Sequence, residues 1–90
     1  MDMYQLQMKR LLAWCQSCEW SATDYHRLFS RIYNVRHYEA IRANTENPYM
    51  AKEAYYSLQL AGKELVEFMH ARCFPNVVKN AVFYLVQNNN

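Results

Sequence analysis

Glycine and proline are almost missing from this chain, and that scarcity limits the folds it can adopt more than any other feature. Glycine occurs once in 90 residues, at Gly62, and proline twice, at Pro48 and Pro75. Folds built from many short strands need these residues at their tight turns. Long helices joined by few connections need far fewer of them. The sequence therefore favours an all-α fold.

The composition indicates one folded domain. Hydrophobic residues make up 52% of the chain and charged residues 20%, whereas disordered chains are poor in apolar residues and rich in net charge. A chain of this length encloses only one hydrophobic core. We therefore expect a single helical domain over residues 1–90, built as a small bundle of three to four helices.

The first helix is expected over about residues 3–19, with Asp2 as its N-cap. Its apolar residues recur at the three-and-four spacing of an amphipathic helix, which predicts one buried face. These residues are Tyr4, Met8, Leu11, Leu12, Cys15 and Cys18.

The second helix is expected over residues 23–43, with Ser21 or Thr23 as its N-cap. Its predicted core face consists of Tyr25, Leu28, Phe29, Ile32 and Val35. Further along, a straight helix would turn Arg36 and Glu39 toward the core and Ile41 toward the solvent. We therefore expect a kink or short break near residues 34–36.

The third helix is expected over residues 48–73, because Asn47 is a good N-cap and Pro48 suits the first helical position. An apolar arc along it faces a polar arc, as in a helix packed on one side. The apolar arc consists of Met50, Ala51, Ala54, Tyr55, Leu58, Ala61, Leu65, Val66, Phe68 and Met69.

The segment 76–87, which follows Pro75, fits two structures. Its valine and aromatic content suits a strand, whereas the spacing of Val78, Ala81, Val82 and Leu85 suits a helix. We favour a helix, because a lone strand would have no partner in this chain. Residues 87–90 are expected to form a frayed end.

Two cysteine-containing motifs raise the question of a metal site. Cys15-x-x-Cys18 and His70-x-x-Cys73 together supply three thiols and an imidazole, the ligands that tetrahedral zinc prefers. Buried cysteines on an apolar stripe are common without any metal. Antiparallel packing of the first and third helices would also hold the two pairs apart. We therefore favour no metal and keep a zinc-stabilised domain as a minor hypothesis.

The sequence carries no recognisable motif for catalysis. It has no glycine-rich phosphate loop, no nucleophile elbow and no His-Glu-x-x-His zinc motif. We therefore expect a protein that is not an enzyme, with no catalytic residues and no cofactor, and that acts by binding.

A first candidate binding surface is a stripe of arginines on the second helix, which we call the arginine stripe. Spacings of three and four line its residues along one face, and arginine with an interleaved tyrosine suits phosphates and stacked bases. The same pattern also fits an ordinary solvated face. The stripe consists of Arg27, Arg31, Asn34, Tyr38 and Arg42.

A second candidate surface lies on the otherwise polar face of the third helix. Tyr49, Tyr56 and Leu60 share one ridge there, which we call the tyrosine ridge. Tyrosine is enriched in protein interfaces because its ring adds apolar area and its hydroxyl finds a hydrogen bond. The alternative is that the fourth segment folds over this ridge and buries it.

Charge, hydropathy and cysteine content indicate where in the cell the protein is expected. The net charge of +2 is only mildly basic, the start of the chain has no apolar leader, and no stretch approaches the length of a membrane span. An odd number of cysteines suits a reducing compartment, so we expect a cytoplasmic protein away from membranes.

We expect a protein-interaction domain, an adaptor, inhibitor or regulator that forms a homodimer. The alternative is a nucleic-acid-binding regulator that uses the arginine stripe.

Overall fold

The computed structural model describes residues 1–87, and within them the chain forms four helices and no strand. Helix α1 spans Met3–Ser17, α2 Ala22–Asn44, α3 Pro48–Ala71 and α4 Asn76–Gln87. The all-α prediction is confirmed, and the ambiguous last segment is a helix. Of the frayed end expected over 87–90, Gln87 closes α4 and the rest lies outside the described residues.

Three of the helices begin at the caps that the sequence predicts. The Asp2 carboxylate accepts the Gln5 N–H at 2.7 Å, and the Gln5 side chain bonds back to the Asp2 N–H. Ser21 and Asp24 form the same reciprocal pair at the start of α2. The side chain of Asn47 accepts backbone N–H groups from the first turn of α3. Each cap satisfies N–H groups that have no partner inside the helix.

Helices α1 and α3 end two residues earlier than predicted, and both end in the same way. The chain adopts a left-handed conformation at Glu19 and at Cys73, with φ of 55° at each. The N–H of the following aromatic residue then donates to a carbonyl in the last turn, at 3.2 Å and 3.1 Å. These reversals bring the rings of Trp20 and Phe74 to 5.7 Å from each other, so the two turns meet.

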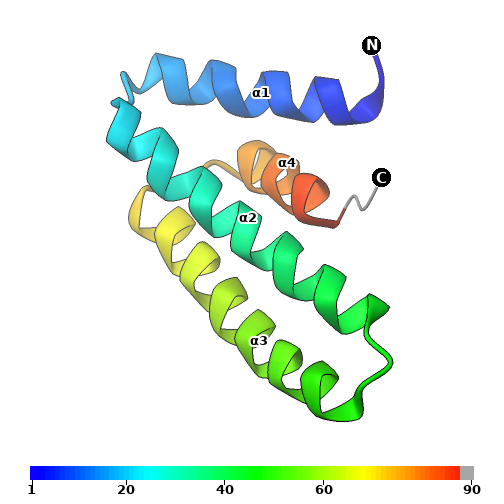
Figure 1. The fold of residues 1–90 in the computed structure, drawn as a ribbon. Coiled ribbons are helices and arrows are strands. Elements are labelled where there is room, and N and C mark those ends of the chain that lie inside the picture. Colours follow the sequence, from blue (N-terminus) through cyan, green and yellow to red (C-terminus); the bar gives the residue numbers. More distant parts are fainter. Residues whose placement is uncertain (88–90) are drawn as a thin grey trace.

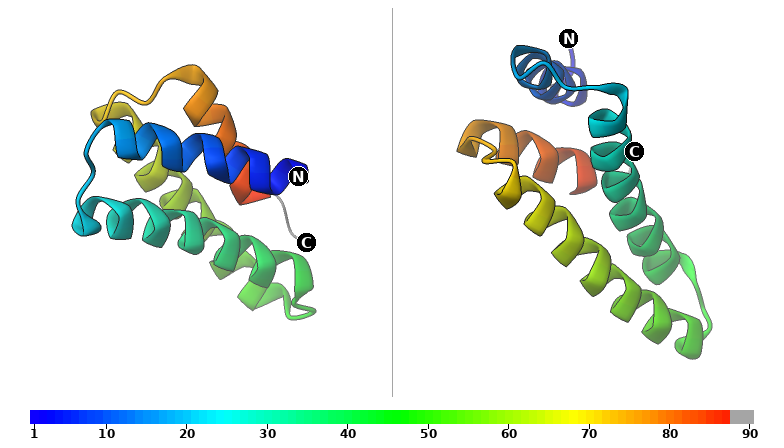
Figure 2. Two further views of the ribbon diagram at one scale, coloured as in Figure 1. Left: turned by 90° about the horizontal axis from the view of Figure 1, so that it is seen from above. Right: turned by 90° about the vertical axis from the view of Figure 1, so that its left-hand side faces the viewer.

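Helices α2 and α3 form a long antiparallel hairpin, and α4 packs between α1 and α2 (Figure 1). Figure 2 shows the same order from two further sides, with α1 reaching the rest of the molecule mainly through α4. The closed end of the hairpin, around residues 45–47, projects beyond α1 and α4. That projecting end has fewer neighbours to cover its apolar residues.

The hydrophobic core lies where all four helices converge. The rings of Trp14 and Trp20 pack against it, and both contact the buried ring of Phe74. The buried core consists of Leu11, Cys15, Leu28, Ile32, Leu65, Met69, Phe74, Val78, Val82 and Leu85.

Four residues that the helical patterns assign to the core are exposed. Cys18 is exposed because α1 has already ended at Ser17, so Cys18 belongs to the turn. Met50, Tyr55 and Val66 belong to the apolar arc of α3 but are about half exposed. The apolar arc is wider than the strip of α3 that its neighbours cover.

Helix α2 runs without a break through residues 34–36. The residues on which the predicted kink rested, Arg36 and Glu39, are half-buried and line an open groove between α2, α1 and the end of α4. Ile41 is half-buried. A change of helical register is therefore unnecessary, because the polar side chains on this side meet solvent and not core.

Candidate interaction surfaces

The tyrosine ridge lies on the outer face of α3 and is uncovered. Tyr49 is 69% exposed, Tyr56 61% and Leu60 59%. Helix α4 packs against α1 and α2 and does not fold over the ridge, although the sequence allowed that alternative. The three side chains span about 17 Å of one continuous helix, at 1.5 Å per residue.

Local contacts hold the start of α3 and one of the ridge rings. The backbone N–H of Tyr49 donates to the Asn47 side chain at 2.9 Å, which holds the first turn of α3. The ring of Tyr56 meets the ring of Tyr55 edge-on, with centroids 5.8 Å apart. A partner would therefore meet aromatic side chains on a regular helix, and the Tyr56 ring has less conformational freedom to lose on binding.

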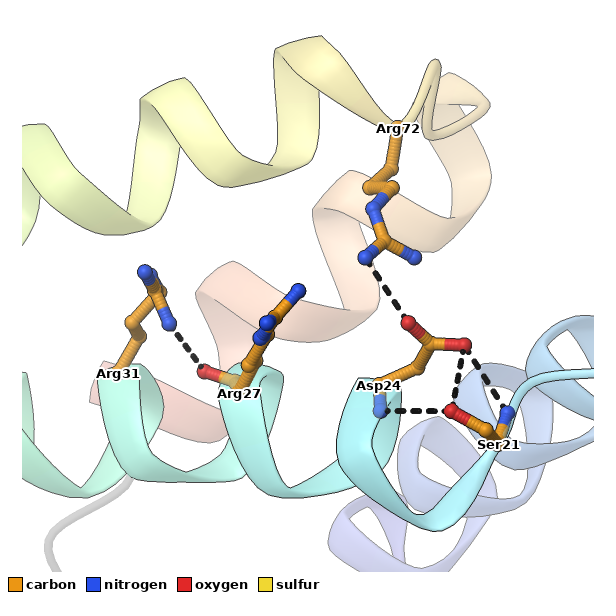
Figure 3. Close-up of polar contacts among 5 residues, drawn as sticks. All are labelled: Ser21, Asp24, Arg27, Arg31 and Arg72. Carbon is orange, nitrogen blue, oxygen red and sulfur yellow. Dashed lines mark hydrogen bonds and ion pairs between the residues drawn. The ribbon is translucent and has the colours of Figure 1, made fainter.

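The arginine stripe is only partly exposed, and some of its side chains contact other parts of the chain. Figure 3 shows the side chains of Arg27 and Arg31 projecting toward α3. The Arg31 guanidinium lies 5.0 Å from the centre of the Phe68 ring and donates to the Arg27 carbonyl at 2.9 Å. At the other end, Arg42 forms an ion pair with Glu39 at 2.6 Å. Arg31 and Tyr38 are half-buried, whereas Arg27, Asn34 and Arg42 are exposed.

An ion pair between α2 and the α3–α4 turn was not expected from the sequence. The Arg72 guanidinium lies 2.9 Å from the Asp24 carboxylate (Figure 3). It also lies over the rings of Trp20 and Phe68, at 5.6 Å and 5.1 Å from their centres. Hydrogen bonding from the Ser21 backbone and from Arg72 lowers the pKa of Asp24. The spacing of Ser21 and Asp24 predicts their capping pair, but only the fold brings Arg72 to it.

An open groove of about 580 Å³ lies between α1, the second half of α2 and the end of α4. Sequence reasoning missed it, because it forms from three helices that are distant in the chain. The ring of His37 stacks on that of Tyr33 at the rim, with centroids 5.6 Å apart. The groove is lined by Tyr4, Met8, Phe29, Ile32, Tyr33, Arg36, His37, Glu39, Ala40, Ala43, Asn44 and Leu85.

The two cysteine-containing motifs do not form a four-ligand site. Within residues 1–87, no three His, Cys, Asp or Glu side chains are grouped so that they could hold a metal ion. Cys15 is completely buried, and burial raises the pKa of its thiol to about 11. A metal ligand must be a thiolate, whereas this thiol stays protonated at neutral pH and packs as a small apolar side chain.

None of the helices in the described part of the chain is long and apolar enough to cross a membrane. The fold and the surfaces together define a small all-α domain with an uncovered aromatic ridge. Comparisons with protein-family models, with curated proteins and with solved structures found no match.

Proposed function

We propose that this chain is a small helical protein-interaction domain that acts by binding, as an adaptor, inhibitor or regulator, and that associates with a second copy of itself. The tyrosine ridge carries the proposal, because it is the apolar surface that the fold leaves on the outer face of its longest helix. Tyrosine in such a position is typical of the centre of protein interfaces.

Self-association is the partner that needs the fewest further assumptions. Small helical domains often complete a marginal core by pairing, and most soluble oligomers are symmetric homodimers. The three cysteines are unpaired in the structure, which supports the cytoplasmic location that we propose for the protein.

Nucleic-acid binding through the arginine stripe stays a prediction. The contacts of Arg31 with Phe68 and of Arg42 with Glu39 engage part of its charge within the chain. A salt titration separates the two functions, since binding to phosphates weakens steeply with added salt and an apolar contact hardly changes.

The test compares two variants that each remove one exposed aliphatic side chain. Leu60→Gln changes the tyrosine ridge, and Val77→Gln changes α4, where Val77 is 57% exposed. Light scattering over a concentration series should show the wild-type mass rising toward that of a dimer. Leu60→Gln should weaken association at least tenfold, because each of two copies loses apolar burial, and Val77→Gln should leave it unchanged.

Circular dichroism melts of both variants check that the fold is intact. A wild-type protein that stays monomeric at every concentration would contradict the proposed self-association. Equal effects of Leu60→Gln and Val77→Gln would contradict the role of the ridge.

A further inference from the structure

The charged residues beside the tyrosine ridge repeat with a period of eleven. The pair Lys52-Glu53 recurs as Lys63-Glu64, and eleven residues are close to three full turns of an α-helix. All four side chains are exposed. At about 100° per residue, both lysines fall on one side of the ridge and both glutamates on the other, each roughly 50° from its centre. The ridge therefore has a basic edge and an acidic edge.

The two edges distinguish between the two symmetric ways in which α3 could pair with its copy. If the helices run parallel about a two-fold axis, the basic edge of each copy faces the acidic edge of the other. If they run antiparallel, each edge faces its own copy, so lysine faces lysine and glutamate faces glutamate. Like charges at an interface cost free energy and opposite charges select the register.

We propose that α3 pairs in parallel with α3 of a second copy, so that Lys52 faces Glu53 and Lys63 faces Glu64 across the dimer. This inference rests on the proposed function, because it specifies how the same ridge meets its partner. Tyr49, Tyr56 and Leu60 then each meet their own copies along the seam.

The structure leaves room for this arrangement. Helix α2 covers the opposite face of α3, and the half of α3 that carries Tyr49 and Tyr56 projects past α1 and α4 (Figure 2). The ridge becomes polar at its far end, where Glu67 lies 3.9 Å from Lys63 of its own chain. The closest approach is therefore expected between Tyr49 and Leu60.

The size of the ridge sets the strength of the dimer. A large aromatic side chain buries roughly 150–250 Å². Two tyrosines and a leucine that are each about two-thirds exposed therefore offer roughly half of the ~800 Å² that each partner contributes to a standard interface. We therefore expect a dimer that dissociates on dilution. In such a dimer the flanking charges should change the dissociation constant measurably.

Charge reversal tests the direction of the helices. In the parallel dimer, Lys52→Glu sets glutamate against the partner's Glu53, and Glu53→Lys sets lysine against the partner's Lys52. These two positions lie within the closest approach, whereas Lys63 is near Glu67 of its own chain. Each single change should weaken association by roughly five- to tenfold at low salt, since two symmetric pairs change from attraction to repulsion. The double variant restores both pairs and should return within about twofold of the wild type. Lys9→Glu, an exposed change of equal charge on α1, is the control.

Dissociation constants are measured by sedimentation equilibrium at low salt and again at high salt, where screening should shrink the effects. If the single changes strengthen association, the two α3 helices run antiparallel. That result would overturn this inference, whereas the proposed self-association would stand. A double variant weaker than both single variants would also overturn it. A monomer at every concentration would contradict both proposals.

Cross-linking supplies a second measurement. In a chain with Cys18→Ser and Cys73→Ser, the substitution Tyr49→Cys places one thiol at the end of the seam. Parallel helices bring the two copies of this thiol together, so mild oxidation should give a covalent dimer. Antiparallel helices put them at opposite ends, and a chain that stays uncross-linked at concentrations where it is dimeric would overturn the parallel arrangement.

Discussion

At the scale of single residues, the fold raises the pKa of the buried Cys15 thiol to about 11. Burial is the main cause of its raised pKa, followed by the nearby Cys18 thiol. The folded state holds the proton of Cys15 more tightly than the unfolded state, in which the thiol titrates near its ordinary value of 9.0. Deprotonation in the unfolded chain therefore favours unfolding at alkaline pH.

We predict that Cys15 makes the protein less stable above pH 9. The contribution of the protonated thiol is constant below pH 9 and is lost as the pH rises from about 9 toward 11. Thermal melts at intervals from pH 8 to pH 10 should show Tm falling by several degrees more in the wild type than in Cys15→Ala. Cys18→Ala, which removes an exposed thiol, should keep the wild-type slope. Equal slopes in wild type and Cys15→Ala would contradict the prediction.

At the scale of helices, α3 contains a residue that costs stability without a packing reason. Gly62 lies in the middle of α3, it has no left-handed conformation, and a Cβ added there would meet no atom within 4 Å. Glycine is unfavourable inside a helix because the unfolded chain has more conformational freedom to lose.

We predict that Gly62→Ala stabilises the monomer by about 0.5–1 kcal/mol. Urea unfolding followed by circular dichroism measures this. The reverse change next to it, Ala61→Gly, should destabilise by about 1 kcal/mol, because Ala61 is buried and lies in the same helix. If Gly62→Ala lowers the stability, something must approach α3 at this position that the monomer does not contain.

At the scale of the whole molecule, α4 connects α1 to the hairpin of α2 and α3. Helix α1 packs on α4, and α4 packs on α2, which forms the hairpin with α3. The buried side chains of α4 therefore contribute to the packing of α1 and to that of the hairpin. Because α1 depends on this packing, its own buried side chains should matter as much as those of the hairpin.

We predict that Leu11→Ala destabilises the molecule by about 2–5 kcal/mol, the usual cost of a leucine cavity in a core. Leu11 is completely buried on α1. Leu60→Ala, measured on dilute monomer, should cost less than about 0.5 kcal/mol, because its side chain is exposed in α3. Urea unfolding followed by tryptophan fluorescence compares them. A cost of Leu11→Ala as small as that of Leu60→Ala would mean that α1 is not part of the cooperative core.

The sequence by itself determined where the helices begin and which faces they bury near the core, whereas the exposure of the tyrosine ridge depended on where α4 packs. Caps such as Asp2 and Asn47, and the spacing of Val78, Val82 and Leu85, act within one or two turns, so they can be recognised without the fold. The ends of α1 and α3 were less predictable, since Glu19 and Cys73 adopt a conformation that usually requires glycine.

Only the tertiary structure decided how far each apolar face is covered. Tyr55 and Val66 are exposed, Arg31 packs on Phe68, and Arg72 reaches Asp24. All of these depend on where a neighbouring helix lies and where it stops. A helical pattern shows which side chains share a face, whereas burial requires a second surface, and the position of that surface follows from packing between segments distant in the chain.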